Sequence, residues 1–474
     1  MSNTITATSS PKDVAVSRSA RRTTLGIAAA GTFLALATYT LPLSDFANLS
    51  TALGAGPAAQ TWILSSMSLG LTAAVLLSGT LADRHGRRFM FVLGSGVLVA
   101  GTLLAVLAAL FGGVLRPDTF IAGRIVEGVG AAAIIASALA LISETFAQPH
   151  ERALASSVWG ASLGAGIAIG PVGAAIAGQL GHWWLSYAGF GLLTALLMTV
   201  AVAGLTESRS AQRHRVDVFG TAVFIAATVL VLIALVAFRT ASSTVPSLVM
   251  LGIAALLFSV FVVSQLRLAE PMLDLRLFRQ PRFAAVHIAG MMVGFGSIGL
   301  ASLVGTFAVI GLGLGVWQTT GLIAVWAGMS TLTAAAVRWL PAWFHGGRQL
   351  GWGLLAIAAG QLVMLNAHSV SPMVIGLFVA GIASGVVNAG LGRETAASAP
   401  AGRSGLGSGV NNTARYLGSA IGVTVAATLL LHGGHDLALI HQGWNAAVLV
   451  CSAAVAIGGA IVLLLGRHIA QRNG

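Results

Sequence analysis

The sequence consists mostly of long apolar runs, each about as long as a helix that crosses the hydrocarbon core of a bilayer. Such a helix takes about 20 mostly apolar residues, and we count fourteen runs of this kind. They must be helices, because lipid offers no partners to backbone polar groups and the runs lack the alternation of barrel strands. We therefore predict an all-α integral membrane protein. The runs are Leu25–Leu43, Gln60–Leu81, Phe89–Leu110, Phe120–Ser143, Ala153–Ala177, Trp183–Leu205, Val218–Phe238, Pro246–Leu266, Phe283–Leu312, Gln318–Trp339, Leu350–Leu365, Met373–Leu391, Gly405–Leu431 and Trp444–Leu465.

The composition agrees with this class. Only 8% of the residues are charged and 56% are hydrophobic, whereas a soluble domain carries about 25% charged residues. The formal net charge of +12 would suggest nucleic acid in a soluble protein. Here the basic residues lie in short loops between apolar runs, so we expect a lipid bilayer and no nucleic acid as the partner.

The basic residues are also strongly asymmetric about the predicted spans. Of the 25 Lys and Arg residues, 22 fall on the side of the two termini. Arg116 and Arg239 fall on the opposite side, and Arg124 lies within a span. Because positively charged loops remain in the cytoplasm, we predict cytoplasmic N- and C-termini and a multi-pass protein of a bacterial inner (cell) membrane.

Two polar loops, at residues 207–217 and 267–282, divide the chain into six spans, two extra spans and six more. Two six-helix halves with a pathway between them form a transporter architecture. The run Phe283–Leu312 is overlong, so we expect part of it to be tilted or to be outer loop. The predicted boundaries are a cytoplasmic tail at 1–24, a bundle at 25–205, two extra helices with flanking loops at 206–282, a bundle at 283–466 and a cytoplasmic tail at 467–474.

The first motif follows the second run and predicts a tight turn between two helices. Gly86 permits a bend that a side chain would resist. Asp83 lies near the start of the third run, where a helix N-terminus favours negative charge. The alternative interpretation is a basic anchoring loop. The motif reads Gly79-Thr-Leu-Ala-Asp83-Arg84-His85-Gly86-Arg87-Arg88.

The second motif lies within the fourth run and contains two ionisable residues, Arg124 and Glu127. Residues three apart share one face of a helix. Ionisable groups within a membrane are expensive unless they pair or face water. A desolvated Glu can cycle its proton near neutral pH, so the two residues are either proton-coupling residues or a structural ion pair.

The third motif is a glycine series with one proline in the fifth run. Small residues spaced about four apart allow close helix contact, and proline kinks a helix. The alternative interpretation is a close-packed, kinked helix with no bearing on the direction of transport. The series consists of Gly160, Gly164, Gly166, Gly170, Pro171 and Gly173.

Together with the segments Gly402–Gly409 and Asn411–Gly418, these motifs resemble the major facilitator superfamily, and in particular its fourteen-helix drug:proton antiporters. The resemblance covers almost the whole chain. It implies a major facilitator fold, two six-helix bundles plus two extra helices, and a transporter rather than an enzyme. It further implies that the Asp83 motif sets which way the transporter faces, that Arg124 and Glu127 couple protons, and that the Pro171 series marks an exporter.

The chain departs from the family pattern in the first run. The resemblance places an Asp nine residues before the Leu41-Pro42 pair and an Asn four residues before the proline, but this chain has Phe33 and Thr38 there. Glu127 is therefore the remaining deep acid, with Asp45 at the outer end of the run as another candidate. This departure leaves retention of proton coupling open.

Other residues are weaker candidates for a substrate cavity. Phe33, Tyr39 and Trp62 could present aromatic surface to a lipophilic cation, or they could be interfacial anchors. Asn388 and Asn411 could hydrogen-bond either a neighbouring helix or a substrate. We expect no metal and no cofactor: Cys451 is the single cysteine, and no phosphate-binding Gly-Lys loop occurs.

The sequence thus predicts a monomeric secondary transporter whose partners are protons and a small-molecule substrate. The leading hypothesis is proton-coupled efflux of lipophilic or cationic drugs by alternating access. One alternative is export of an endogenous metabolite, such as an antibiotic, siderophore, sugar or peptide. The other is a membrane sensor or scaffold that no longer transports.

Overall fold

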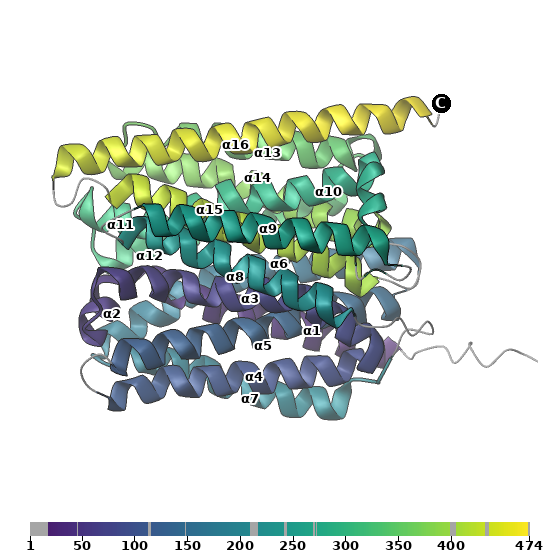
Figure 1. Ribbon diagram of the computed structural model, residues 1–474, viewed down its shortest axis with the longest axis horizontal. Coiled ribbons are helices and arrows are strands. Elements are labelled where there is room, and N and C mark those ends of the chain that lie inside the picture. Colours follow the sequence, from purple (N-terminus) through teal and green to yellow (C-terminus); the bar gives the residue numbers. More distant parts are fainter. Residues whose placement is uncertain are drawn as a thin grey trace, which may run out of the picture.

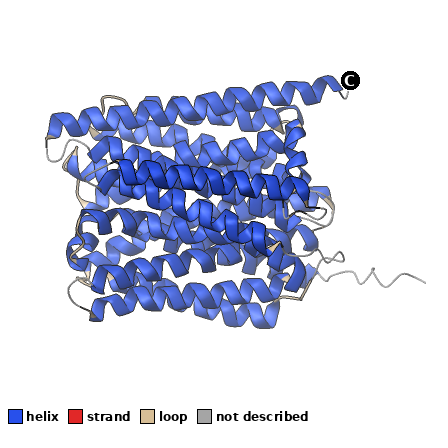
Figure 2. Ribbon diagram, in the orientation of Figure 1, coloured by secondary structure: helices blue, strands red, loops and turns tan. Residues whose placement is uncertain are grey.

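The computed structural model describes residues 18–44, 46–111, 115–146, 148–208, 217–240, 244–268, 271, 273–398, 404–431 and 436–472. Asp45, most of the N-terminal tail and the last two residues lie outside this description. Every regular element in the described ranges is a helix (Figure 2). The prediction of an all-α protein is confirmed.

The first half of the chain forms apolar helices. A helix satisfies its own backbone polar groups, which lipid cannot do. A short helix and two 3₁₀ turns lie between the long helices. The elements are α1 (Arg18–Thr40), η1 (Leu41–Leu43), α2 (Phe46–Leu53), α3 (Pro57–His85), α4 (Arg87–Leu107), η2 (Ala108–Leu110), α5 (Leu115–Thr145), α6 (Pro149–Gln179) and α7 (Trp184–Gly204).

The rest of the chain begins with a pair of helices and continues with a second group. The pair is α8 (Val218–Thr240) and α9 (Val245–Arg267). The second group is η3 (Leu275–Arg279), α10 (Pro281–Met292), η4 (Val293–Ile298), α11 (Gly299–Ile310), α12 (Val316–Ala336), η5 (Val337–Trp339), η6 (Ala342–Phe344), α13 (Gly347–Leu362), α14 (Val370–Ser398), α15 (Ser404–Leu431) and α16 (Leu437–Arg472).

Thirteen helical stretches of the described chain are long and apolar enough to cross a membrane, compared with the fourteen predicted. The difference is the predicted run Leu350–Leu365, which corresponds to α13. This helix has 16 residues, whereas each of the thirteen stretches has at least 18. It nevertheless packs along α14 and α16, so it belongs to the same bundle as its neighbours.

The helices form two groups that meet along their length (Figure 1). Helices α1 and α3 to α7 pack on one another, as do α10 to α16. The two groups touch where α3 packs on α15 and where α6 packs on α12 and α14. The pair α8 and α9 crosses this junction on one face, with α8 against both α3 and α15. The residue boundaries of the two bundles stay a prediction.

The overlong ninth run is continuous helix rather than outer loop. Residues Pro281–Ile310 form α10, a π-helical turn at Val293–Ile298, and α11. The π turn contains Gly294 and Gly296, whose missing side chains admit α15 and α16: a Cβ on Gly294 would overlap the Arg415 carbonyl oxygen. The π turn accommodates additional residues in the run without breaking the helix. Such turns are frequent at functional sites.

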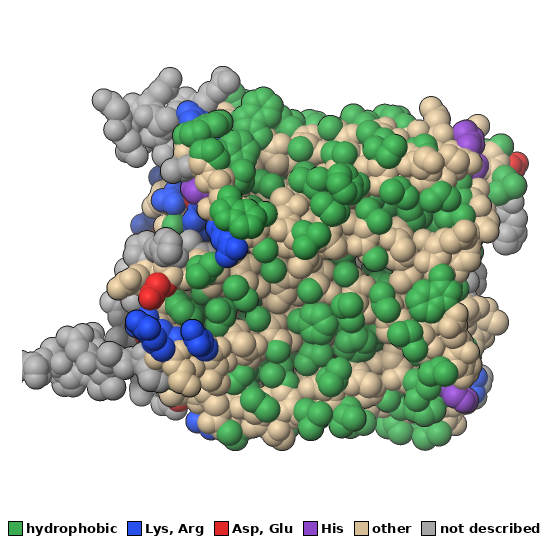
Figure 3. Space-filling model, turned by 180° about the vertical axis from the view of Figure 1, so that it is seen from behind, with side chains coloured by type: hydrophobic (Ala, Val, Ile, Leu, Met, Phe, Trp, Pro, Cys, Tyr) green, Lys and Arg blue, Asp and Glu red, His purple; other side chains and the backbone are tan. Residues whose placement is uncertain are grey.

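The outer surface of the helices is apolar, as a lipid-facing surface must be. Helix α9 exposes Leu248, Ile253, Leu256 and Val263. Figure 3 shows hydrophobic side chains across the middle of one face, with Lys and Arg gathered towards one end. This distribution is the spatial counterpart of the charge asymmetry in the sequence.

The contact between α3 and α5 generates a prediction about stability. A Cβ on Gly70 would overlap the Ile125 carbonyl oxygen and press on Gly128. We expect Gly70→Ala to destabilise the protein by about 1–3 kcal/mol, the usual cost of overpacking. Gly321→Ala is the matched control, because a Cβ there meets open space. Denaturation in detergent, followed by tryptophan fluorescence, measures both, and equal midpoints would contradict the predicted packing.

Candidate transport pathway

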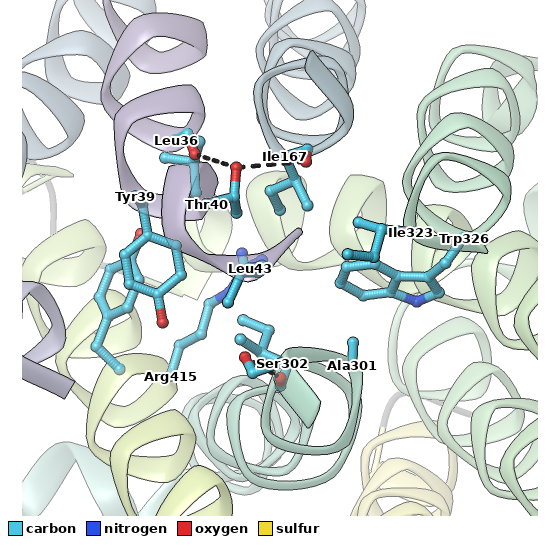
Figure 4. Close-up of a pocket in the computed structure, with 12 residues that line it drawn as sticks. Leu36, Tyr39, Thr40, Leu43, Ile167, Ala301, Ser302, Ile323, Trp326 and Arg415 are labelled. Atoms are coloured by element: carbon cyan, nitrogen blue, oxygen red, sulfur yellow. Dashed lines mark hydrogen bonds between the residues drawn. The ribbon is translucent and has the colours of Figure 1, made fainter. Parts of the chain in front are cut away.

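A cavity of about 410 Å³ lies between the two bundles. Its walls are mostly apolar, and its polar lining residues include Tyr39 and Arg415. Figure 4 shows Trp326 across the cavity from Tyr39, with the Arg415 side chain extending towards Leu43. The lining residues are Leu36, Tyr39, Thr40, Leu43, Ile167, Ile298, Ala301, Ser302, Ile323, Trp326, Arg415 and Tyr416.

A second cavity of about 270 Å³ lies nearer the connection between α14 and α15, whereas the first lies nearer the connection between α1 and α2. Arg415 lines both. Arg415 is therefore a wall residue common to two cavities that lie between the bundles. The second cavity is lined by Leu139, Trp159, Asn388, Leu391, Gly392, Thr395, Asn411, Asn412 and Arg415.

Pro171 explains how α6 is fastened to α1 beside the first cavity. A proline has no N–H, so the carbonyl four residues earlier, at Ile167, loses its helical donor. The Thr40 hydroxyl lies 3.3 Å from that carbonyl and 3.0 Å from the Leu36 carbonyl, so the two carbonyls share its one hydrogen (Figure 4). The Ser44 hydroxyl donates to the Pro171 carbonyl at 2.8 Å. Side chains from the end of α1 thus satisfy backbone groups at the proline.

The glycines of the same helix allow this approach. A Cβ on Gly166 would overlap the Phe33 carbonyl oxygen, and one on Gly170 would overlap the Ala37 carbonyl oxygen. Gly173 faces the ring of Phe190 on α7. The close packing predicted for the series is confirmed, while its bearing on the direction of transport stays a prediction.

Arg124 and Glu127 form an ion pair inside the first bundle. The Arg124 Nη1 lies 2.7 Å from Glu127 Oε2, and the two side chains are 1% and 0% exposed. Arg124 also donates to the backbone carbonyls of Thr38 at 2.8 Å and Tyr39 at 3.0 Å. Pro42 lacks the N–H that would bind the Thr38 carbonyl, so Arg124 satisfies a second carbonyl freed by a proline.

Only one oxygen of the Glu127 carboxylate is paired. Oε1 is buried and has no hydrogen-bond partner among the described residues. A buried carboxylate oxygen without a partner is costly, and protonation of the carboxylate would remove its negative charge. The pair is therefore both a structural tie between α5 and α1 and a chemically suitable proton site.

The turn between α3 and α4 has the tight geometry predicted for the Asp83 motif. Gly86 has φ of 123°, a backbone conformation that suits glycine. Arg87 is 2% exposed and bridges Asp83 at 3.3 Å and Glu144, at the end of α5, at 2.7 Å. Gly79 is buried in α3, Arg84 is exposed, and Arg88 donates to the Val202 carbonyl of α7.

The carboxylate at the α4 N-terminus belongs to Glu207, which the sequence analysis did not single out. Its two oxygens accept from the backbone N–H groups of Arg88 at 3.2 Å and Phe89 at 3.1 Å. A Cβ on Gly86 would overlap this carboxylate. Negative charge is favourable at a helix N-terminus. Glu207 lies about 120 residues along the chain from the helix that it caps. The only feature of the sequence that could have drawn attention to it is its position at the end of the sixth run.

A similar charged cluster lies in the second bundle at Glu394 of α14, a residue that the sequence analysis also missed. Its carboxylate lies 2.8 Å from Arg282 and 3.2 Å from Arg393, and Arg393 donates to Gln349 at 2.8 Å. Burial, followed by the positive charge of Arg393, lowers the pKa of the nearby His345 imidazole.

The structure places some of the weaker candidates in the lining of a cavity and others elsewhere. Tyr39 lines the first cavity, and Asn388 and Asn411 line the second. Asn411 also donates to the Val286 carbonyl of α10 at 3.0 Å, so it binds a neighbouring helix. Phe33 packs in an apolar cluster of the first bundle, and Trp62 packs in one formed by α3, α5, α8 and α15. Neither residue lines these two cavities.

A multi-pass helical protein with two bundles and a cavity between them belongs to the class of membrane transporters. The family model described as Major Facilitator Superfamily matches residues 28–423. The chain therefore belongs to the major facilitator superfamily and is a transporter of small molecules rather than an enzyme.

Curated relatives include proteins of mycobacteria and streptomycetes. The multidrug resistance protein Stp of Mycobacterium tuberculosis is 27% identical, over 78% of this chain and 68% of the relative. The multidrug efflux pump LfrA of Mycolicibacterium smegmatis is 30% identical, over 78% and 73%. The probable actinorhodin transporter of Streptomyces coelicolor is 27% identical, over 82% and 69%.

A solved structure with the same fold is the human organic anion transporter TETRAN. Its TM-score with this chain is 0.69 at 17% sequence identity, and the match covers 93% of this chain and 99% of that one. At this identity the likeness shows the fold alone. The predicted major facilitator fold is confirmed.

The proline contact on α6 can be tested with a double-mutant cycle. Thr40→Val removes the hydroxyl that binds the Ile167 carbonyl, and we expect it to destabilise the protein by about 1 kcal/mol. In a Pro171→Ala background the new N–H can bind that carbonyl, so the same change should cost less. Unfolding midpoints of the four proteins measure the coupling, and additive effects would contradict the assignment.

The Glu207 cap predicts a second effect. Glu207→Ala leaves two N–H groups of α4 without their carboxylate, and we expect a loss of about 1 kcal/mol. Glu207→Gln keeps an acceptor oxygen without the charge, so it should lie between the wild type and the alanine variant. Thermal unfolding in detergent gives the order, and an alanine variant as stable as the wild type would show that the cap does not contribute.

Proposed function

We propose that this transporter exports lipophilic drugs or related small molecules in exchange for protons, by alternating access between its two bundles. The observation that carries the proposal is the buried Arg124–Glu127 pair, in which one carboxylate oxygen has a partner and the other has none among the described residues. The names of the relatives, which include drug efflux and antibiotic resistance proteins, support export of this kind of cargo.

The pair is positioned to sense the cavity. Arg124 binds the Tyr39 backbone carbonyl, and the Tyr39 side chain lines the cavity and hydrogen-bonds Ser68 on α3 at 3.0 Å. Protonation of Glu127 would remove its charge and weaken its bond to Arg124, while Arg124 would keep its two backbone carbonyls. Because Arg124 also binds the Tyr39 backbone, a movement of Arg124 would shift Tyr39 and so change the lining of the cavity.

The two bundles would move against each other at two helix–helix contacts. Helix α3 packs on α15, and α6 packs on α12. Rocking of one bundle against the other would open first one cavity and then the other to the two sides of the membrane. The charged clusters at Asp83 and Glu394 would fasten or release the helix ends at one side. Because the arginines gather there, we propose that this side is cytoplasmic.

Export of an endogenous metabolite is the second candidate. The match to a probable actinorhodin transporter, which extends over 82% of this chain, favours it. The same fold and the same proton site would serve both cargoes, so the two candidates differ in substrate and share the mechanism.

The proton site is tested in proteoliposomes with an imposed pH gradient and two fluorescent probes, rhodamine 123 and fluorescein methyl ester. We expect wild-type protein to accumulate a probe against its gradient. Glu127→Gln should abolish this accumulation, because the amide cannot release a proton, while probe exchange without a pH gradient continues.

Asp118→Asn is the matched control, because Asp118 is an exposed acid in the first turn of the same helix. It should behave as the wild type does. Gradient-driven accumulation by Glu127→Gln at the wild-type rate would rule out Glu127 as the coupling residue. A wild type that moves neither probe would count against drug export and favour a narrow endogenous substrate.

A further inference from the structure

Arg415 is a buried charge to which no described residue supplies a counter-charge. The sequence analysis counted it among the 22 basic residues on the side of the termini, but that assignment was wrong: the structure places it in α15, where it is 5% exposed and lines both cavities. Its Nε has no hydrogen-bond partner, and no described residue forms an ion pair with the guanidinium. Tyr39 and Tyr416, which line the first cavity with it, are not acidic residues.

The other charges within the membrane-spanning core do not neutralise Arg415. Glu127 is bound to Arg124, and the two charges cancel within the first bundle. The buried Glu394 of α14 pairs with Arg282 and Arg393. Neither cavity has an acidic residue among those that line it. Buried charges are normally paired, and an ionisable residue that faces a cavity within the membrane marks a substrate or ion pathway. The missing partner of Arg415 is therefore expected to come from the cargo.

We propose that Arg415 is the recognition residue for an anionic group on the substrate, so that the cargo is a lipophilic organic monoanion. The proposal rests on the proposed export function and changes the expected charge of the substrate: the aromatic residues of the first half suggested a lipophilic cation, but the lining of the two cavities offers a cation no carboxylate.

The chemistry of the cavity agrees with a cargo that has an apolar body and one acidic group. A guanidinium binds a carboxylate or sulfonate through two parallel hydrogen bonds. Ile298, Ile323 and Trp326 line the same cavity and provide an apolar surface for a ring system.

The position of Arg415 suits transport as well as binding. Because its side chain lines two successive cavities, an anion bound to it could remain bound while access changes from one side to the other. The Gly418 position, one turn further along α15, lies against the Met291 carbonyl beside the π turn of the ninth span. This close contact packs α15, which carries Arg415, against α10 within the second bundle.

The test compares two xanthene dyes that share one skeleton and differ in charge, fluorescein methyl ester, an anion at pH 8, and rhodamine 123, a cation. Equilibrium binding to the purified transporter in neutral detergent is followed by fluorescence anisotropy, with no gradient present. We expect the wild type to bind the anion at least tenfold more tightly than the cation. Arg415→Met should weaken anion binding at least tenfold and leave cation binding no weaker.

Two further variants keep the test decisive. Arg415→Lys retains the positive charge without the planar fork, so its affinity for the anion should lie between those of the wild type and the methionine variant. Arg338→Met removes one exposed arginine at the end of α12 and should bind both dyes as the wild type does. If Arg415→Met fails to fold, the dye preference of the wild type and the effect of Arg415→Lys decide.

The inference is overturned if the wild type binds the cation as tightly as the anion, or if Arg415→Met binds the anion unchanged. Its failure is separable from failure of the proposed export. Anion binding without gradient-driven flux would reject proton-coupled export and retain the anion site. Gradient-driven flux of the cation, without preferential anion binding, would reject the anion site and retain export.

Discussion

The structure depends on satisfying backbone carbonyls that two prolines release inside a membrane. Pro42 and Pro171 lack N–H groups, and lipid offers no replacement donor. Arg124 donates to the Thr38 carbonyl, and the Thr40 hydroxyl donates to the Ile167 carbonyl. These bonds tie α1 to α5 and α6, and they hold the end of α1 against the cavity. Transport elements are thus built on the places where regular helix hydrogen bonding is interrupted.

The charges of the membrane core divide into two kinds. Arg124 and Glu127 neutralise each other and are held by backbone groups, so that pair can serve structure and proton exchange together. Arg415 has no such arrangement among the described residues, and it faces space on both sides along the bundle junction. A buried charge needs a partner. Arg124 and Glu127 are each other's partner, whereas we propose that the substrate is the partner of Arg415.

The helix ends on the arginine-rich side are fastened by carboxylates that come from distant parts of the chain. Glu207 caps α4 from beyond α7, and Glu394 binds Arg282 from the end of α14. Both are side chains at helix ends, where small movements of one helix change the bonds of another. Rocking of the bundles would therefore break or make a few charged contacts at this side while the apolar helix faces slide within lipid.

The sequence by itself determined the membrane class, the spans and the family, because these follow from run length, charge asymmetry and short motifs. It also determined that Arg124 and Glu127 share a helix face, since their spacing is three. Only the tertiary structure decided that Arg124 satisfies α1, that Glu207 rather than Asp83 caps α4, and that the run at Pro281–Ile310 is continuous through a π turn. Phe33, Tyr39 and Trp62 looked alike as aromatic residues in apolar runs, yet only Tyr39 lines the first cavity. Such distinctions depend on how helices rotate and cross, and a one-dimensional pattern of apolar residues in lipid does not record which face of a helix meets a neighbour, a cavity or the bilayer.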